Sequence, residues 1–304
     1  MVVAATGFFD GVHRGHRAVL DTVTRLAREQ GKTPAVVTFW PHPRAVLQQD
    51  AAKFRLLTTL DEKKSLLHSL GIEQVHVLAF DKEFASQSTD QFFGKYLRDM
   101  FGVTTLVAGY DHRVGHDTNQ TQQEMFEVAI KNGIEPVRVS EFENTSDHVV
   151  ISSTKIREAL CSGEIEFASK MLGYRYGLEG AIVEGKKIGR TIGFPTANIK
   201  LYEPLKILPA NGVYAVVAQV HGNCYKGITN IGTRPTISSG TEKSIETHLL
   251  DFNEDIYGLP LKLEFVQRLR EEKRFDSLEY LKIQLENDRE QALDILATGE
   301  FKLR

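Results

Sequence analysis

Cysteine and long apolar runs are both scarce in this sequence. Its 304 residues include only two cysteines, Cys161 and Cys224, which lie far apart and in no metal-binding or redox motif. A disulfide framework is therefore excluded, and we expect reduced thiols. No apolar run approaches the ~20 residues of a membrane-spanning helix, and the first residues lack the charged region, apolar core and cleavage site of a signal peptide. We expect a cytoplasmic protein with no membrane partner.

An excess of charge of one sign is also absent. The chain has 37 Lys and Arg residues against 40 Asp and Glu residues, so its formal net charge is −3. This balance gives no reason to expect nucleic acid or an anionic surface as a partner. Any phosphate binding must come from a local arrangement of residues. The length indicates two domains rather than one.

The first half of the sequence alternates between strand-like and helix-like segments. Within 59–71, for example, Leu60, Leu66, Leu67 and Leu70 recur at helical spacing. The alternation predicts a Rossmann-like α/β domain with a parallel sheet, in which ligands bind beyond the carboxyl ends of the strands. The expected strands are 2–6, 34–39, 74–80, 104–109 and 135–140, and the expected helices are 17–30, 59–71, 89–101 and 122–133.

The rhythm changes after residue 172. Short strand-like segments separated by Gly, Pro and Asn turns replace the alternation, and the last segment, 277–297, is a long amphipathic helix. This pattern predicts a small antiparallel β-barrel or sandwich closed by the terminal helix. We therefore expect one domain at 1–172 and a second at 173–304.

The sequence TGFFDGVHRGH joins the first expected strand to the first expected helix. Its glycines, Gly7, Gly11 and Gly15, allow the backbone to approach a ligand, and the helix that follows offers N–H groups and a positive dipole end. The imidazoles of His13 and His16 can donate to phosphate oxygens. The motif is neither GxGxxG nor the lysine-bearing P-loop. Taken alone, it is better explained as a glycine turn with one capping histidine.

A second candidate phosphate site is the segment ISSTKIR. Ser152, Ser153 and Thr154 are natural N-cap residues, and Lys155 and Arg157 add cations to the first helical turn, where the dipole disfavours them. A bridging anion such as a triphosphate would offset that cost. In isolation, an ordinary capped surface helix explains the segment equally well. Two phosphate signals in one half favour the anion.

Both motifs resemble those of a known family. TGFFDGVHRGH is similar to the HxGH signature of nucleotidyltransferases and, in this extended form, to the adenylyltransferase module of prokaryotic riboflavin kinase/FAD synthetases. ISSTKIR matches the S-S-T-x-I-R motif of the same module, whereas GYDHRVG departs from the family's G-x-N-F-R-F-G because Asp111 replaces an amide residue. The resemblance implies catalytic roles for His13, His16 and Arg157, and nucleotide binding by Gly7, Phe8, Asp10, Gly11, Asp111, Ser153 and Thr154.

The second half contains the segment GKKIGRTIGFPTANI. Its glycines make it pliable, its Lys and Arg residues make it basic, and Thr196 and Asn198 offer oxygen ligands that suit Mg²⁺. Composition alone favours a glycine-rich hairpin with a solvated basic edge. However, GFPTAN is similar to a specific signature of flavokinases. That resemblance implies Thr196 and Asn198 as metal ligands and ATP binding by Lys186, Arg190, Gly193, Pro195, Thr196 and Asn198.

Further flavokinase-like segments follow in the family's order: NGVYAV, NIGTRPTI, IETHLLDF and FVQRLREEKRFDS. Glu246, in IETHL, corresponds to the catalytic glutamate of the family. A carboxylate there can accept the proton of a primary alcohol that attacks a γ-phosphate. Its alternating strand pattern alone would make Glu246 a solvent-facing residue. Flavin contacts are expected from the later loops and the terminal helix, without assigned residues.

The resemblance covers nearly the whole chain and implies a bifunctional enzyme of flavin cofactor synthesis. The barrel is expected to convert riboflavin and ATP to FMN. The N-terminal domain is expected to adenylylate FMN with a second ATP, giving FAD and pyrophosphate, and both steps are expected to need Mg²⁺. The expected partners are these small molecules, and a homo-oligomer remains open. Family members usually have additional residues before the first strand, inside which this chain begins.

Three alternatives compete with this interpretation. The chain could have only one working half, it could be a nucleotidyltransferase for another acceptor fused to an unrelated barrel, or it could be a non-catalytic flavin or nucleotide sensor. Retention of His13, His16 and Arg157 in one half and of Thr196, Asn198 and Glu246 in the other disfavours all three.

Overall fold

The computed structural model describes residues 1–47, 54–109, 121–139, 150–185, 188–235 and 241–297. The chain divides into two compact units, Met1–Ser153 and Thr154–Arg304. The described elements of the first unit are β1 (Val2–Thr6), α1 (Arg14–Gln30), β2 (Thr33–Trp40), α2 (Pro43–Leu47), α3 (Leu60–Ser69), β3 (Gln74–Ala79), α4 (Lys82–Ala85), α5 (Thr89–Gln91), η2 (Phe92–Met100), β4 (Val103–Ala108), α6 (Gln122–Lys131) and β5 (Glu135–Arg138).

The second unit begins just after Ser153, the first residue of α7. Its described elements are α7 (Ser153–Ser162), α8 (Ile165–Leu172), β6 (Gly177–Val183), α9 (Ile188–Thr191), β7 (Ala197–Leu201), β8 (Gly212–Val220), β9 (Asn223–Pro235), β10 (Thr241–Leu249), β11 (Pro260–Arg270) and α10 (Leu278–Ile295). The boundary expected from sequence, after residue 172, would place α7 and α8 in the first domain and stays a prediction.

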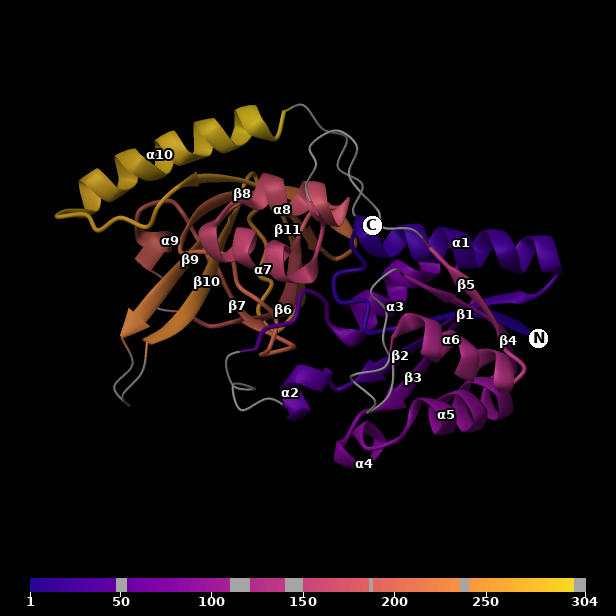
Figure 1. Ribbon diagram of the computed structural model, residues 1–304. Coiled ribbons are helices and arrows are strands. Elements are labelled where there is room, and N and C mark those ends of the chain that lie inside the picture. Colours follow the sequence, from indigo (N-terminus) through magenta and orange to yellow (C-terminus); the bar gives the residue numbers. More distant parts are fainter. Residues whose placement is uncertain (48–53, 110–120, 140–149, 186–187, 236–240, 298–304) are drawn as a thin grey trace. The chain divides into compact units, whose positions relative to one another are not determined.

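The first unit is built on a five-stranded sheet with the order β3-β2-β1-β4-β5 (Figure 1). All of its strand pairs are parallel. Successive side chains of the central strand β1 face opposite layers: Val3 and Ala5 pack with α1 and α3, whereas Val2 and Ala4 pack with η2 and α6. The predicted parallel sheet with helices on both faces is confirmed.

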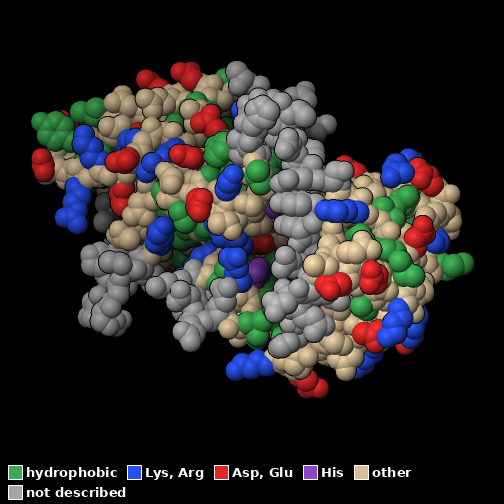
Figure 2. Space-filling view, viewed as in Figure 1, with side chains coloured by type: hydrophobic (Ala, Val, Ile, Leu, Met, Phe, Trp, Pro, Cys, Tyr) green, Lys and Arg blue, Asp and Glu red, His purple; other side chains and the backbone are tan. Residues whose placement is uncertain are grey.

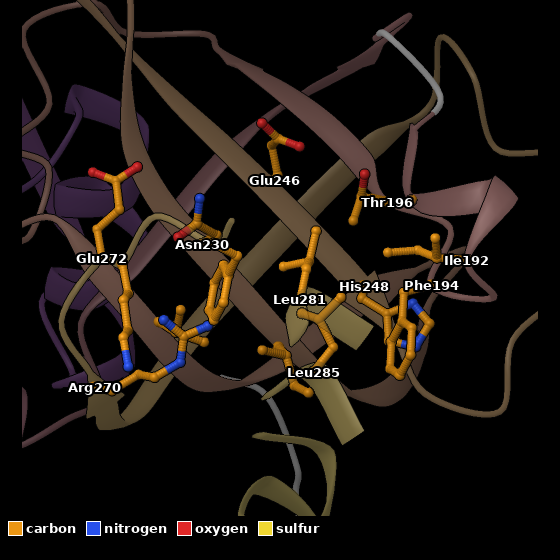
Figure 3. Close-up of a pocket in the computed structure, with 15 residues that line it drawn as sticks. Ile192, Phe194, Thr196, Asn230, Glu246, His248, Arg270, Glu272, Leu281 and Leu285 are labelled. Atoms are coloured by element: carbon orange, nitrogen blue, oxygen red, sulfur yellow. The ribbon is translucent and has the colours of Figure 1, made fainter. Parts of the chain in front are cut away.

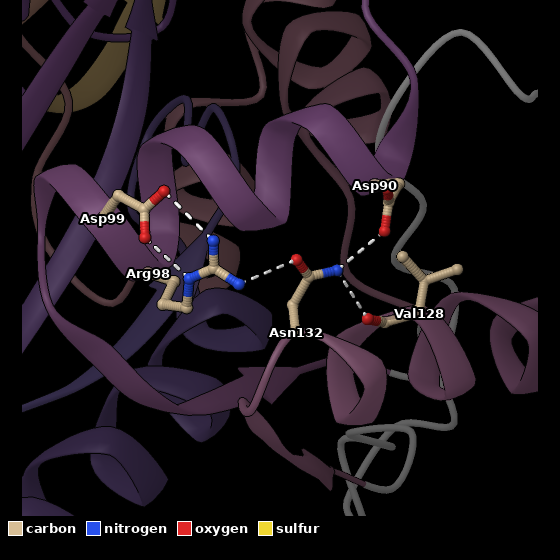
Figure 4. Close-up of polar contacts among 5 residues, drawn as sticks. All are labelled: Asp90, Arg98, Asp99, Val128 and Asn132. Atoms are coloured by element: carbon tan, nitrogen blue, oxygen red, sulfur yellow. Dashed lines mark hydrogen bonds and ion pairs between the residues drawn. The ribbon is translucent and has the colours of Figure 1, made fainter.

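One predicted helix of this unit is wound differently from the expectation. The segment expected as a single helix at 89–101 is a short α5 followed by the π-helix η2. A π turn aligns residues five apart, and Phe92 and Leu97 are both buried. At the end of α6, the amide of Asn132 accepts from Arg98 at 3.5 Å and donates to Asp90 at 2.9 Å, which ties η2 to α6 (Figure 4).

The second unit is a closed antiparallel barrel with the strand order β10-β7-β6-β11-β8-β9, in which β9 also pairs with β10 (Figure 1). Of the two forms expected from sequence, the structure has the barrel. Residues of β8 alternate between its two sides: Val213, Ala215 and Val217 form an apolar cluster with α10, so the buried Tyr214 and Val216 face the barrel interior. The terminal helix thus covers the outer wall of the barrel, as predicted.

One face of the molecule shows how its charged side chains are distributed. Acidic and basic side chains are interspersed over the face seen in Figure 2, in keeping with the nearly balanced composition. Among the described helices, none is long and apolar enough to cross a membrane.

Candidate active sites

The turn after β1 lies at the carboxyl end of the central strand, where parallel sheets bind their ligands. Its backbone follows a tight path, since Phe9 and Val12 have positive φ angles of 52° and 37°, which is uncommon for residues other than glycine. Gly11, at φ 80°, needs the freedom of glycine. The N–H of Gly7 donates to the Val37 carbonyl at 3.1 Å, which fastens the turn to β2.

The carboxylate of Asp10 connects this turn to residues 57 and 58 by hydrogen bonds. The carboxylate is 3% exposed and accepts from the N–H groups of Leu57 and Thr58 at 3.0–3.1 Å and from the Thr58 hydroxyl at 3.1 Å. The Thr58 hydroxyl in turn accepts from the Gly11 N–H at 3.1 Å. These contacts give Asp10 and Gly11 an internal role in shaping the loop. The nucleotide contacts predicted for them stay predictions.

The two histidines of the motif are stacked at the start of α1, with ring centroids 3.6 Å apart. His13 is the N-cap, and its Nδ1 accepts from the His16 N–H at 3.3 Å, so Nε2 is the ring nitrogen that can donate a hydrogen bond. Burial, followed by the effects of His13 and Lys63, lowers the pKa of His16 well below its ordinary value. His16 is therefore neutral at pH 7 and can act as a hydrogen-bond donor without adding charge.

Helix α1 offers an anion-binding end. The N–H groups of Arg14 and Gly15 have no acceptor within the described residues, and the first turn contains no acidic residue. Unsatisfied N–H groups and the helix dipole together favour a phosphate there. Glycine at position 15 leaves room for the His13 ring, since a Cβ there would lie 3.3 Å from it.

Lys63 is a member of this site that the sequence motifs do not indicate. It lies on α3, is 0% exposed, and its ammonium donates to the Phe8 carbonyl at 2.9 Å and to the Thr38 hydroxyl at 3.1 Å. It also lies 3.7 Å from the centroid of the Phe8 ring. Burial lowers the pKa of Lys63 from 10.5 to about 8, against the opposite effect of the Asp10 carboxylate.

The structure places only part of the ISSTKIR motif beside this turn. The Ser153 hydroxyl donates to the Asp10 carbonyl at 3.0 Å. Thr154 and Arg157 lie on α7 in the second unit, where Thr154 is exposed and Arg157 is half-buried. Asp111 lies outside the described residues, as does Lys186 of the second half.

The second site is a cavity of about 350 Å³ on the outer wall of the barrel (Figure 3). Its volume is in the range typical of small-molecule sites. Figure 3 shows Glu246 and Thr196 toward one end of this cavity, called the polar end below, and Leu281 and Leu285 of α10 toward the opposite end, called the apolar end. The described lining residues are Gly189, Ile192, Phe194, Thr196, Val213, Ile228, Asn230, Glu246, His248, Arg270, Glu272, Lys273, Phe275, Leu281 and Leu285.

Three neighbouring strands align polar residues at the polar end. Glu246 on β10 is the register partner of both Asn198 on β7 and Asn230 on β9, and paired residues of adjacent strands face the same side. Glu246 and Thr196 both line the cavity (Figure 3). Asn198 is buried, and Gly185 packs so closely on it that a Cβ there would overlap its amide. The structure thus brings together Glu246, Thr196 and Asn198, which were predicted from separate motifs.

Within the described part of GKKIGRTIGFPTANI, the GFPTAN segment forms a compact turn. The helical turn α9 precedes it, and the Phe194 N–H donates back to the Gly189 carbonyl at 2.8 Å. Gly193 turns the chain with a φ of 84°. The Pro195 carbonyl accepts from Nδ1 of His248 at 2.8 Å, so the segment is fixed to β10. Arg190, the remaining predicted ATP contact, is exposed on α9.

Arg270 and Asp288 connect the cavity to the terminal helix. The guanidinium of Arg270 donates to both oxygens of Asp288 at 2.8–3.1 Å, and Gln284 donates to Asp288 at 2.9 Å. Asp288 is 0% exposed although it lies on an otherwise amphipathic helix. Asn230, His248, Arg270 and Glu272 lie in the flavokinase-like segments, where the sequence assigned them no individual roles, and Asp288 lies outside every motif. For Asp288, an acid on the apolar side of the helix was the available signal.

A parallel-sheet unit whose glycine-rich turn leads into a helix N-terminus and a barrel with a carboxylate-bearing cavity are together typical of a nucleotide-dependent transferase. The family model described as FAD synthetase matches residues 1–155, and the model described as riboflavin kinase matches residues 172–296. The chain belongs to the bifunctional riboflavin kinase/FMN adenylyltransferase family. The family membership predicted from the motifs is confirmed.

Individual relatives match over nearly the full chain. The Bacillus subtilis (strain 168) bifunctional riboflavin kinase/FMN adenylyltransferase is 40% identical and covers 96% of this chain and 91% of its own length. The Escherichia coli (strain K12) protein of the same description is 36% identical, covering 94% and 90%. A solved Streptococcus pneumoniae structure titled as a macrolide-efflux protein aligns with a TM-score of 0.86 at 32% identity, covering 96% and 93%.

Proposed function

We propose that this chain phosphorylates riboflavin to FMN in the barrel and then adenylylates FMN to FAD in the N-terminal unit. The observation that supports both activities is the presence, in one chain of this family, of two separate sites that each contain their expected groups. Glu246 and Thr196 line one cavity, and the His13–His16 pair begins the helix at the other site. The proposal also places the enzyme in the cytoplasm.

In the kinase reaction, the primary hydroxyl of the ribityl chain attacks the γ-phosphorus of ATP. The new bond is from the ribityl oxygen to phosphorus, the bond to the β-γ bridging oxygen breaks, and ADP leaves. Glu246 accepts the hydroxyl proton, since a carboxylate at the polar end of the cavity can reach an alcohol held in the same cavity. The flavin ring occupies the apolar end, near Phe194, Leu281 and Leu285.

Mg²⁺ fits the residues present at this site. Thr196 and Asn198 supply neutral oxygen ligands, which suit an ion that keeps several waters and binds substrate phosphates. Within the described residues no cluster of three His, Cys, Asp or Glu side chains could hold a metal by itself, so these two residues would hold the ion together with the nucleotide. When bound, Mg²⁺ supplies charge neutralisation for the phosphates.

In the adenylyl transfer, the phosphate of FMN attacks the α-phosphorus of ATP, and pyrophosphate leaves. The nucleophile is ionised near neutral pH, so no general base is needed. The site has to orient the two phosphates and stabilise the developing charge. The amides at the start of α1 bind the phosphates, and His13 and His16 donate to their oxygens. The catalytic role of Arg157 stays a prediction from the sequence motif.

Incubation of the purified protein with riboflavin, ATP and Mg²⁺, followed by chromatographic separation of flavins, tests both steps. We expect FMN to appear first and FAD to follow. An absence of FMN would contradict the kinase proposal. Accumulation of FMN without FAD would contradict the adenylyltransferase proposal, and omission of Mg²⁺ should stop both steps.

A further inference from the structure

Lys63 is a buried cation for which the proposed mechanism has no step. Its side chain is 0% exposed on α3 and ends beneath the turn that follows β1. Its ammonium donates to the Phe8 carbonyl at 2.9 Å and to the Thr38 hydroxyl at 3.1 Å, and Thr38 itself donates to the same carbonyl at 3.2 Å. The Phe8 carbonyl therefore accepts two hydrogen bonds, one from Lys63 of α3 and one from Thr38 of β2.

Burial at this position makes a charged side chain energetically unfavourable. Lys63 shares a helical stripe with Leu60, Leu67 and Leu70, where an apolar residue such as methionine would satisfy the packing. Burying an ammonium is unfavourable unless it is paired. Asp10, the nearest acid identified as acting on it, already accepts from Leu57 and Thr58. Packing alone therefore does not account for a lysine here.

The charge of Lys63 acts on the neighbouring groups of the site. Among the described residues, the titratable groups that interact with it are Asp10 of the turn and His16 of α1, and its remaining neighbours are Phe8, Thr38 and Trp40. Its positive charge disfavours protonation of His16. A buried cation next to a helix N-terminus also adds positive potential for an anion bound above the turn.

We propose that Lys63 is a positioning residue of the adenylyl-transfer site: it fixes the Phe8 carbonyl, and hence the turn, and its ammonium supplies a positive charge close to the bound triphosphate without touching it. This inference rests on the proposed adenylyl transfer at this turn. It predicts that, in the FAD-forming reaction, loss of Lys63 changes the KM for ATP more than it changes kcat.

The test compares wild type, Lys63→Met, Lys63→Arg and a matched control, Lys64→Met, on the same helix. In FMN-to-FAD conversion, Lys63→Met should raise the KM for ATP about tenfold, the scale of one fixed charge acting through an effective dielectric constant of about 20, with a smaller change in kcat. Lys63→Arg should recover part of the affinity, and Lys64→Met should behave as wild type. The riboflavin kinase reaction of each variant checks that the second unit is intact.

The pH profile distinguishes a charge effect from a structural one. Because the pKa of Lys63 is about 8, the wild-type KM for ATP should rise between pH 7 and pH 9.5 as the ammonium loses its proton, and this rise should be absent from Lys63→Met. Wild-type protein that forms no FAD would contradict the proposed function itself. If wild type forms FAD but its KM for ATP does not change over this pH range, the inference is wrong. An unchanged KM for ATP in Lys63→Met would also contradict it. If Lys63→Met does not fold, the wild-type pH profile alone still tests the inference.

Discussion

At the scale of single residues, Glu246 illustrates how a role depends on neighbours that are distant in the chain. Its own segment, IETHL, alternates like a half-exposed strand. In the structure Glu246 lies between two asparagine register partners, Asn198 and Asn230, and faces a cavity that also includes Thr196. The pairing of β10 with β7 and β9 creates this setting, and no local pattern encodes it.

Replacement of Glu246 by glutamine should lower the rate of FMN formation at least about 100-fold, because an amide cannot accept the hydroxyl proton. Conversion of supplied FMN to FAD should stay close to wild type, since that reaction uses the other unit. Both rates can be measured by flavin chromatography. Glu254→Gln, at an exposed carboxylate, is the matched control, and full kinase activity in Glu246→Gln would remove Glu246 from the mechanism.

Lys63 could have been identified from the sequence by its place in the hydrophobic pattern of its helix, although it belongs to no recognised motif. A lysine on the apolar stripe of the helix at 59–71 breaks the hydrophobic pattern. Such a break indicates a buried polar group. What the group bonds, the Phe8 carbonyl and the Thr38 hydroxyl, follows only from the folding of α3 under the first turn.

The buried lysine should also give the first unit an unusual stability profile. The folded pKa of Lys63, about 8, lies below its ordinary 10.5, so the folded state binds fewer protons between these values and stability rises with pH. Relative to Lys63→Met, wild type should gain about 2 kcal/mol in unfolding free energy between pH 7.5 and pH 9.5. Urea unfolding followed by the fluorescence of Trp40, the single tryptophan, measures this, and parallel pH dependences of the two proteins would contradict it.

At the scale of elements, the long helices were predictable and the shortest helix was not. Helices α1 and α10 are long enough to show helical periodicity, β1 is a short apolar run, and the sequence places all three within a few residues. Helix α9 has four residues and includes Gly189, so it has little helical propensity of its own. Its formation depends on the Phe194 N–H closing on the Gly189 carbonyl.

The buried ion pair between Arg270 and Asp288 joins the terminal helix to the cavity wall. Asp288→Ala should leave Arg270, whose side chain is 20% exposed, without its partner, and should destabilise the second unit by about 3 kcal/mol. The KM for riboflavin should rise several-fold, because Leu281 and Leu285 lose their fixed position over the cavity, whereas FAD formation from FMN should not change. Steady-state kinetics and thermal unfolding test this, with Glu290→Ala on the exposed side of α10 as the control.

At the scale of the whole molecule, the sequence indicated two units because the two halves have different periodicities. The parallel sheet follows from the alternation of strands and helices. Whether the second half forms a barrel or a sandwich did not follow, because closure depends on pairings between β10 and both β7 and β9. The same pairings assemble the polar end of the cavity, so the part of the fold that was unpredictable is also the part that builds the proposed kinase site.

Separate units with separate sites should work when they are supplied on different molecules. Glu246→Gln retains only the adenylyltransferase site, and His16→Ala, which removes one of the stacked histidines at α1, should retain only the kinase site. A mixture of the two variants with riboflavin, ATP and Mg²⁺ should form FAD, although neither variant does so alone, because FMN released by one molecule can bind to the other. FAD formation in the mixture should follow a lag while FMN accumulates, and chromatography of timed samples measures it. Accumulation of FMN without FAD in the mixture would show that FMN in solution cannot reach the second site.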